Sequence, residues 1–202
     1  MTPRQALVQG IEALRLHHAG ETVERLLRYI ALLEKWNRTY NLTAIRTPLE
    51  MVSHHLLDSL AVVPHLPMPA AGTLADIGSG AGLPGIPIAI ARPGWRVTLN
   101  DSNQKKTAFM RQAVIELALS NVEVHEGRVE QWQPQARFAV VISRAFAELP
   151  EFIAACRHLV APDGVLAAMT GAAPAAPDCR AVSLAVPYLD ARRHLVLCRP
   201  EA

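Results

Sequence analysis

A glycine-rich stretch over residues 73–85, TLADIGSGAGLPG, constrains the fold of this chain more than any other segment. A short apolar run ends in Asp76, and an apolar segment over 86–91 follows the stretch. Four glycines lie between them, at Gly78, Gly80, Gly82 and Gly85. This pattern predicts a strand, a tight turn and the start of a helix, and such a turn is a common place for a bound cofactor.

Beyond the glycines, short apolar runs alternate with helical patterns, which predicts a parallel α/β sheet with right-handed crossovers. The predicted strands are 73–77, 96–100, 122–126, 138–143 and 164–169, and the predicted helices are 86–92, 104–119 and 149–160. Two further apolar runs, 181–186 and 194–199, are joined by PYLDARR. The sheet should therefore end in an antiparallel pair.

The first third of the chain has a helical period instead. Residues 3–35 read as two amphipathic helices separated at Gly20. Thr47, Pro48 and Glu50 have the spacing of a helix N-terminus with a capping box, and that helix should run to about residue 63. The segment 64–72 then reads as a linker. We therefore expect an N-terminal helical extension over 1–70 and a main domain over 71–202.

Two groups of polar residues stand out in this extension. The segment 36–46, WNRTYNLTAIR, reads as a loop in which Arg38, Tyr40, Asn41 and Arg46 combine cations with an aromatic ring. Such a segment either contacts RNA or simply joins two helices with solvated arginines. His54 and Asp58, four residues apart, form either a metal or acid–base pair or a satisfied polar pair.

The composition of the chain limits which classes of protein it can belong to. With 50% hydrophobic residues and 19% charged ones, the 202-residue chain can bury a sizeable core. The net charge of +2 excludes a basic arm. Three widely spaced cysteines without a CxxC pair disfavour a disulfide framework and a zinc site. We see no signal peptide and no membrane-length apolar run, so we expect a cytoplasmic protein without a metal.

The glycine stretch formally matches GxGxxG, the dinucleotide fingerprint, but that match alone is weak. Pro87 forces the helix to begin near Gly85, which lengthens the loop. Asp76 suits a cationic ligand and repels a pyrophosphate. Asp101, at the end of the second strand, can accept hydrogen bonds from ribose hydroxyls in either cofactor. These features favour S-adenosylmethionine over a dinucleotide.

Two later loops should lie at the same carboxyl edge of the sheet. The loop after the third strand, 125–130, offers backbone groups and Glu130 to an adenine edge. The loop after the fourth strand brings Arg144 and Phe146 to where a target base would lie, although Phe146 suits the core equally well.

Taken together, DIGSGAGLPGIP, NLTAI, HLLDSL, ISRAFA and a terminal RHLV resemble the RsmG (GidB) family of bacterial guanine-N7 methyltransferases. The resemblance runs from about Trp36 to Arg199. It implies a seven-stranded Rossmann-like class I methyltransferase fold with an N-terminal helical extension. It also implies S-adenosylmethionine as methyl donor and, as acceptor, a guanine in the 530 loop of 16S ribosomal RNA, met within the small ribosomal subunit by a monomeric enzyme.

The resemblance also implies roles for individual residues. Basic residues near the reaction centre would be Arg128, Arg144 and Arg193. Cofactor contacts would fall on Gly78, Leu83, Val129, Glu130 and Arg144, with Asp101 as the ribose-binding acid. The sequence departs from the family at Thr170, where most members have a lysine, and in the shortened segment GAAPAAPDCR that follows. Another cation, Arg180 or Arg192, would then have to hold RNA at this edge.

The chemistry agrees with this reading. Guanine N7 carries a lone pair and no proton, so its methylation needs no general base. The chain has no Asn/Asp-Pro-Pro-aromatic motif for an exocyclic amine. Two other classes stay open on the residues alone: a nicotinamide-dependent oxidoreductase, and a non-catalytic RNA- or ribosome-binding module.

Overall fold

The computed structural model describes residues 1–17, 19–67, 69, 71–144, 148–172 and 178–199. The helices are α1 (Pro3–Ala13), α2 (Gly20–Tyr40), α3 (Pro48–Met51), α4 (Asp58–Leu60), α5 (Gly85–Ala91), α6 (Gln104–Glu116) and α7 (Leu149–Cys156). A π-helical turn, η1 (Val52–Leu57), joins α3 to α4, and short 3-10 turns are η2 (Val63–His65), η3 (Val129–Gln131) and η4 (Arg157–Leu159). The strands are β1 (Gly72–Ile77), β2 (Trp95–Asp101), β3 (Val122–Glu126), β4 (Phe138–Arg144), β5 (Val160–Thr170), β6 (Cys179–Ser183) and β7 (His194–Cys198).

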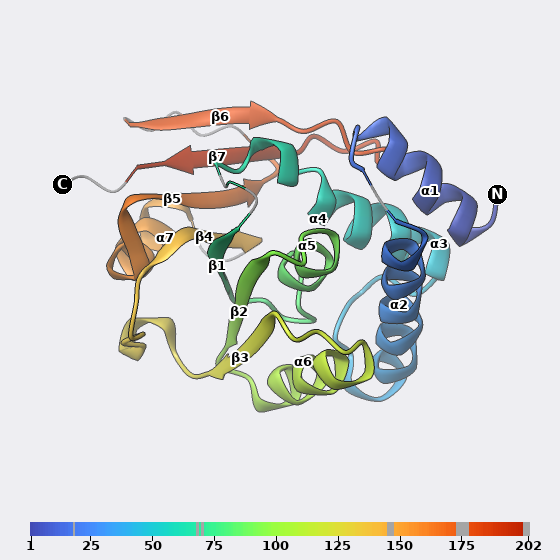
Figure 1. The fold of residues 1–202 in the computed structure, drawn as a ribbon, viewed down its shortest axis with the longest axis horizontal. Coiled ribbons are helices and arrows are strands. Elements are labelled where there is room, and N and C mark those ends of the chain that lie inside the picture. Colours follow the sequence, from blue (N-terminus) through green and yellow to red (C-terminus); the bar gives the residue numbers. More distant parts are fainter. Residues whose placement is uncertain (18, 68, 70, 145–147, 173–177, 200–202) are drawn as a thin grey trace.

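The seven strands form one sheet in the order β3-β2-β1-β4-β5-β7-β6. The first five run parallel, and β7 lies antiparallel to both β5 and β6 (Figure 1). The order turns back on itself between β1 and β4, which is the place where open α/β sheets bind ligands. The predicted parallel sheet with an antiparallel end is confirmed.

Successive residues along a strand point to opposite faces of the sheet, and each face has its own apolar layer. Leu74 and Val140 join the N-terminal helices, α5 and α6 in one cluster, whereas Ala75 and Val141 face α7 in the other. Figure 1 shows α1 to α4 gathered beside α5 and α6, so the predicted N-terminal extension packs on that layer. The division of the chain after residue 70 stays a prediction.

The helix α2 is longer than its sequence pattern indicates. It begins at Gly20 and continues through Trp36 to Tyr40, so the loop predicted from residue 36 was wrong over its first five positions. The rings of Trp36 and Tyr40, one helical turn apart, lie 5.1 Å from centroid to centroid and support this extra turn. Asn41 then ends the helix in the left-handed conformation, with φ at 50°.

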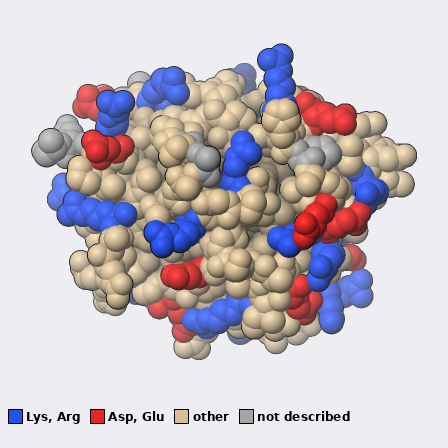
Figure 2. Space-filling view, viewed as in Figure 1, with Lys and Arg blue, Asp and Glu red and all other residues tan. Residues whose placement is uncertain are grey.

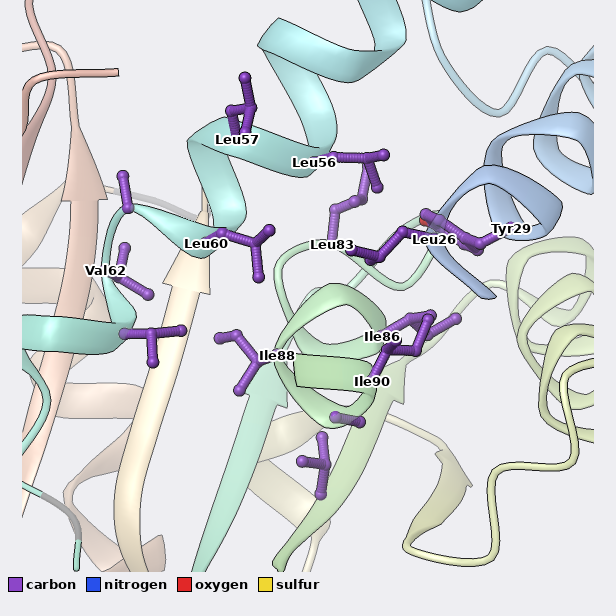
Figure 3. Close-up of a cluster of buried hydrophobic side chains, with 14 of the residues drawn as sticks. Leu26, Tyr29, Leu56, Leu57, Leu60, Val62, Leu83, Ile86, Ile88 and Ile90 are labelled. Carbon is purple, nitrogen blue, oxygen red and sulfur yellow. The ribbon is translucent and has the colours of Figure 1, made fainter. Parts of the chain in front are cut away.

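The side of α2 that faces the sheet is anchored on the glycine stretch. In Figure 3, Leu26 and Tyr29 of α2 point toward Leu83 and toward Ile86 of α5. Both Leu26 and Tyr29 are fully buried. Leu56 and Leu60 come to the same cluster from η1 and α4 (Figure 3). The N-terminal extension therefore shares its core with the segment most suited to a cofactor.

The helix predicted from Thr47 starts as expected. The Thr47 hydroxyl accepts a hydrogen bond from the backbone N–H of Glu50 and donates one to the Glu50 carboxylate. The helix does not continue regularly to residue 63, because η1 interrupts it with a wider turn. This change in period decides where the side chains of His54 and Asp58 lie.

The cysteines contradict the sequence-based expectation. Cys179 and Cys198 form a disulfide, although the count and spacing of the cysteines disfavoured a disulfide framework. The antiparallel register places Cys179 of β6 directly opposite Cys198 of β7, so residues 19 apart in sequence become neighbours. The third cysteine, Cys156, is free and buried.

A separate hollow of about 880 Å³ lies beside the β2 and β3 strands, where the segment 131–138 passes over the sheet. His125 lines it from the loop 125–130, but none of the other residues predicted to hold the cofactor or the RNA does. Over the described residues, no helix is long and apolar enough to cross a membrane.

Candidate active site

The glycine loop follows β1 and is held by backbone hydrogen bonds. Gly78, Gly80 and Gly82 have φ values of 66°, 61° and 84°, which favour glycine. The carbonyl of Ser79 accepts hydrogen bonds from the N–H groups of Gly82 and Leu83, each at 2.9 Å. A Cβ added at Gly80 would meet nothing closer than 3.9 Å, so the space above this residue is open. The loop is a rigid cradle with room for a ligand over Gly80.

Asp76 lies at the end of β1 beneath this loop and is fully buried. Its Oδ2 accepts a hydrogen bond of 2.8 Å from the N–H of Gly85, the first residue of α5. Its Oδ1 is buried without a hydrogen-bond partner among the described residues. Burial raises the pKa of this carboxyl to about 7, although Gly85 and Arg144 oppose the increase. An unpartnered acidic oxygen under the loop suits a cationic ligand, as S-adenosylmethionine provides.

Asp101 joins the end of β2 to the same loop. Its Oδ2 accepts a hydrogen bond of 3.0 Å from Gly80 N–H, and its Oδ1 accepts one of 2.9 Å from Asn103 N–H. The Lys106 ammonium lies 3.5 Å away from Oδ2. Each carboxylate oxygen can accept more than one hydrogen bond, so Asp101 keeps capacity for ribose hydroxyls. The residues of the cradle therefore fit S-adenosylmethionine.

The loop after β3 completes this edge. Val129 is buried in η3, whereas Arg128 and Glu130 on either side are exposed. Asn100 holds the loop in place, since its side-chain amide donates to the Gly127 carbonyl at 3.0 Å. Asn100 is buried and was not predicted from the sequence, where an amide at the end of a strand pattern was the available signal.

Tyr29 was also missed. Its hydroxyl donates a 2.7 Å hydrogen bond to the carbonyl of Ala81, and so ties α2 to the glycine loop. Burial raises the pKa of Tyr29 far above its usual range, so it stays a neutral donor. A tyrosine within the apolar stripe of an amphipathic helix was the available signal.

Arg144, the last residue of β4, is held by the π-helical segment. Its Nη1 donates to the carbonyl of His54 at 3.0 Å and to Asp58 Oδ2 at 3.1 Å. Arg193, just before β7, donates from Nε to Asp58 Oδ1 at 3.1 Å. The structure therefore brings two of the three predicted basic residues together. Arg128 has no charged partner among the described residues and is exposed.

The predicted pair of His54 and Asp58 does not form. Asp58 contacts the two arginines, and the His54 ring lies 2.8 Å from the Ser53 hydroxyl instead. The π-helical turn is the reason, since its i→i+5 spacing moves residues four apart off a common face. No metal-like cluster of three or more His, Cys, Asp or Glu side chains occurs within the described ranges.

The NLTAI segment lies against the same turn. The Thr43 hydroxyl is 2.9 Å from His55 Nε2, and Asn37 of α2 accepts from the Thr43 N–H at 2.9 Å. Burial lowers the pKa of His55 to about 4, with Arg144 adding to the effect. The three motifs NLT, DSL and SRA are thus connected through Thr43, His55, Asp58 and Arg144.

The predicted RNA-binding residues lie outside this buried network. Arg38 pairs with Glu34 at 3.1 Å, and its side chain is 76% exposed. Tyr40 is 43% exposed, and Arg46 donates to Asn41 Oδ1 at 3.4 Å. Figure 2 shows basic and acidic side chains interspersed on the face in view. Phe146 and residues 173–177 of the shortened segment lie outside the described residues.

Comparison with known proteins places this site in a family. The model of the GidB family, described as rRNA small subunit methyltransferase G, matches residues 22–180. The chain belongs to the GidB family. Two GidB relatives, both named ribosomal RNA small subunit methyltransferase G, match almost end to end. The Methylobacillus flagellatus protein is 52% identical over 96% of each chain, and the Chromobacterium violaceum protein is 54% identical over 94% of each.

Solved structures agree on the fold of this GidB chain. A methyltransferase from Aquifex aeolicus matches with a TM-score of 0.54, at 16% identity, over 70% of this chain and 89% of its own. Coclaurine N-methyltransferase, solved with N-methylheliamine and S-adenosylhomocysteine, also gives 0.54, at 14% identity, over 83% and 56%. At these identities the likeness supports the class I methyltransferase fold, which confirms the predicted fold class.

Proposed function

We propose that this protein transfers a methyl group from S-adenosylmethionine to N7 of a guanine in the 530 loop of 16S ribosomal RNA. One observation carries the proposal: the open glycine cradle lies over a buried, unpartnered Asp76 oxygen and beside Asp101. Family membership gives the acceptor class, because the family is described as rRNA small subunit methyltransferase G. We expect a monomer that works in the cytoplasm on the small ribosomal subunit.

The cradle assigns a role to each residue that would hold the cofactor. Asp76 would face the cationic end of the donor, and Asp101 would accept hydrogen bonds from the ribose. Gly78, Gly80, Gly82 and Leu83 would contact the donor through the loop, and Val129 and Glu130 would border the adenine. When bound, S-adenosylmethionine supplies an electrophilic methyl group on its sulfonium.

The residues around the acceptor orient it and need not remove a proton. Guanine N7 attacks with a lone pair, so catalysis rests on proximity and orientation. Positive charge develops on the base, and arginines therefore do not stabilise that charge. We assign Arg144, Arg193 and Arg128 to guanine O6 or a nearby phosphate. Cys156 is no nucleophile, because burial raises the pKa of its thiol to about 12.

RNA would approach over the exposed residues at the end of α2. Arg38 and Arg46 flank Tyr40, and their cations suit phosphates while the exposed ring suits a base. Asn41 would shape this corner through its left-handed turn. With Thr170 in place of the family's lysine, exposed Arg180 and Arg192 are the cations closest in sequence to the shortened segment.

The test is methyl transfer to small subunits that lack 7-methylguanosine. We expect one modified guanine in the 530 loop, mapped by mass spectrometry of RNA fragments. S-adenosylhomocysteine should raise the unfolding temperature, whereas nicotinamide dinucleotides should not. Arg144→Ala should reduce turnover without unfolding the chain. Methylation elsewhere, or none with a folded cofactor-binding enzyme, would refute the proposal.

A further inference from the structure

Asp58 is the one carboxylate that the two site arginines share. It lies at the start of α4 and is 1% exposed, whereas the side chains of Arg144 and Arg193 are 23% and 30% exposed. One oxygen serves each arginine, both at 3.1 Å. A buried carboxylate therefore holds two cations, one at the end of β4 and one just before β7, and both still reach solvent.

The π-helical turn gives Arg144 a second anchor. In η1 the N–H of Asp58 bonds back to the Ser53 carbonyl, five residues earlier. The His54 carbonyl then accepts from Arg144 Nη1 at 3.0 Å. Both hydrogens of Nη1 are thereby used, by His54 and Asp58. Within the described residues, Nε and Nη2 of Arg144 have no acceptor, so three N–H donors remain for a ligand.

Electrostatic attraction for RNA does not explain why Asp58 lies between the two arginines. Two arginines without Asp58 would give a stronger positive site, whereas the carboxylate reduces the local sum from +2 to +1. Burying a carboxylate also costs solvation, which only its paired arginines offset. The arrangement fixes the planes of two otherwise flexible guanidinium groups, and it lowers their total attraction for RNA.

We propose that Asp58 is a positioning residue, which orients Arg144 and Arg193 so that their free N–H groups meet the acceptor guanine. This inference rests on the proposed function, since it needs a guanine as the ligand. Arginine N–H donors bind guanine O6 and phosphate oxygens in fixed geometry, and N7 must stay free because its lone pair attacks the methyl group. Asp58 itself lies behind the arginines and touches no ligand.

The decisive variant is Asp58→Asn, because a positioning role and a purely electrostatic role predict different values of kcat for it. The exchange is isosteric and raises the local charge by one unit. Loss of orientation should lower kcat by about 10- to 100-fold, while KM for the small subunit stays equal or falls. A purely electrostatic role predicts an unchanged kcat and tighter, salt-dependent RNA binding.

Glu21→Gln is the matched control. It makes the same chemical exchange and also frees an arginine, Arg25, whose Nη2 lies 2.6 Å from Glu21. This pair lies near the start of α2, and neither residue is among the site residues named above. The control should keep the wild-type kcat. Binding of S-adenosylhomocysteine and the unfolding temperature are measured on all variants, which separates misfolding from misorientation.

A double-mutant cycle tests whether Asp58 acts through Arg144. In an Arg144→Ala background, Asp58→Asn should lower kcat by a smaller factor than in the wild type. Equal factors, or a wild-type kcat for Asp58→Asn, overturn the inference. If Asp58→Asn does not fold, Arg144→Lys decides: it keeps the charge and loses the fork, and wild-type turnover would overturn the inference. A folded wild-type enzyme without any guanine methylation refutes the proposed function instead.

Discussion

Replacing Asp76 by Asn should change how the stability of the ligand-free protein depends on pH. The carboxyl is fully buried, and its pKa rises from 3.8 to about 7 in the folded state. The folded protein thus holds a proton that the unfolded chain releases between these values. Stability is full below about pH 4 and falls as the pH rises to 7, by about 4 kcal/mol at 1.4 kcal/mol per unit.

His55 changes stability in the opposite direction. Its pKa falls from 6.5 to about 4 on folding, so the unfolded chain binds the proton in this interval. Its contribution is present above 6.5 and is lost as the pH drops toward 4, by about 3 kcal/mol. In the wild type the two slopes nearly cancel between about pH 4 and 6.5. The Asp76 effect is therefore visible only as a difference between variants.

Urea unfolding of the wild type and Asp76→Asn, followed by circular dichroism from about pH 5 to pH 8, isolates that difference. The Asn amide oxygen can still accept from the Gly85 N–H, so the variant removes the charge and keeps the loop contact. Its stability relative to the wild type should rise by about 3 kcal/mol up to pH 7 and then level off. Asp163→Asn makes the same exchange at an exposed carboxyl in β5 and serves as the control. A difference between Asp76→Asn and the wild type that does not change with pH would mean that water reaches the Asp76 carboxyl, and the argument from burial would be wrong.

Cofactor binding supplies an independent readout of the same group. S-adenosylhomocysteine lacks the sulfonium of the donor but keeps its ammonium group, and a cation beside Asp76 favours the ionised carboxylate. Its affinity should therefore weaken below about pH 7, by up to about tenfold per unit. Asp76→Asn should bind weakly at every pH. Calorimetric titration that shows equal, pH-independent affinity for both proteins would remove Asp76 from the cofactor site.

Three further perturbations test the supports of the site. Tyr29→Phe leaves the Ala81 carbonyl without its donor and should lower the free energy of unfolding by about 1–3 kcal/mol in urea, and should weaken S-adenosylhomocysteine binding. Asp101→Ala should reduce that affinity by at least about tenfold in calorimetry, because it loses two loop contacts as well as the ribose acceptor. Reducing the disulfide, whose cysteines are 19 residues apart, should lower stability by about 3 kcal/mol, and a Cys179→Ser variant should not respond to the reductant.

Most of the fold follows from local patterns in the sequence. The apolar runs and the glycine turn predict β1 to β5. The central strands β1 and β4 are buried on both faces and read as continuous apolar segments, whereas β3 at the sheet edge alternates valines with polar residues. The limits shift by a few residues at the strand that begins at Val160 and at the helix that ends at Cys156. The start of α5 at Gly85 was predictable, since Pro87 admits no earlier helical start.

The disulfide was not predictable from spacing. The number and spacing of cysteines reveal only short motifs such as CxxC. The bond between Cys179 and Cys198 depends instead on the register of two antiparallel strands. A prediction that β6 and β7 pair, without their register, does not place these two residues opposite each other. The same limit applies to Tyr29, whose partner carbonyl is 52 residues away in the chain.

The site residues also differ in whether the sequence pattern could locate them. Asp76 and Asp101 could be found because strand ends position them, and the topology carries every strand end to one edge. The role of Asp58 could not be found, because the helical period that paired it with His54 assumes 3.6 residues per turn, whereas η1 is wider. That irregular turn replaces the regular helical hydrogen-bond pattern, and its His54 carbonyl accepts from Arg144. Unusual turns of this kind are retained where function requires them. The departure from the sequence pattern therefore coincides with the arginine pair, which is where the acceptor is expected to bind.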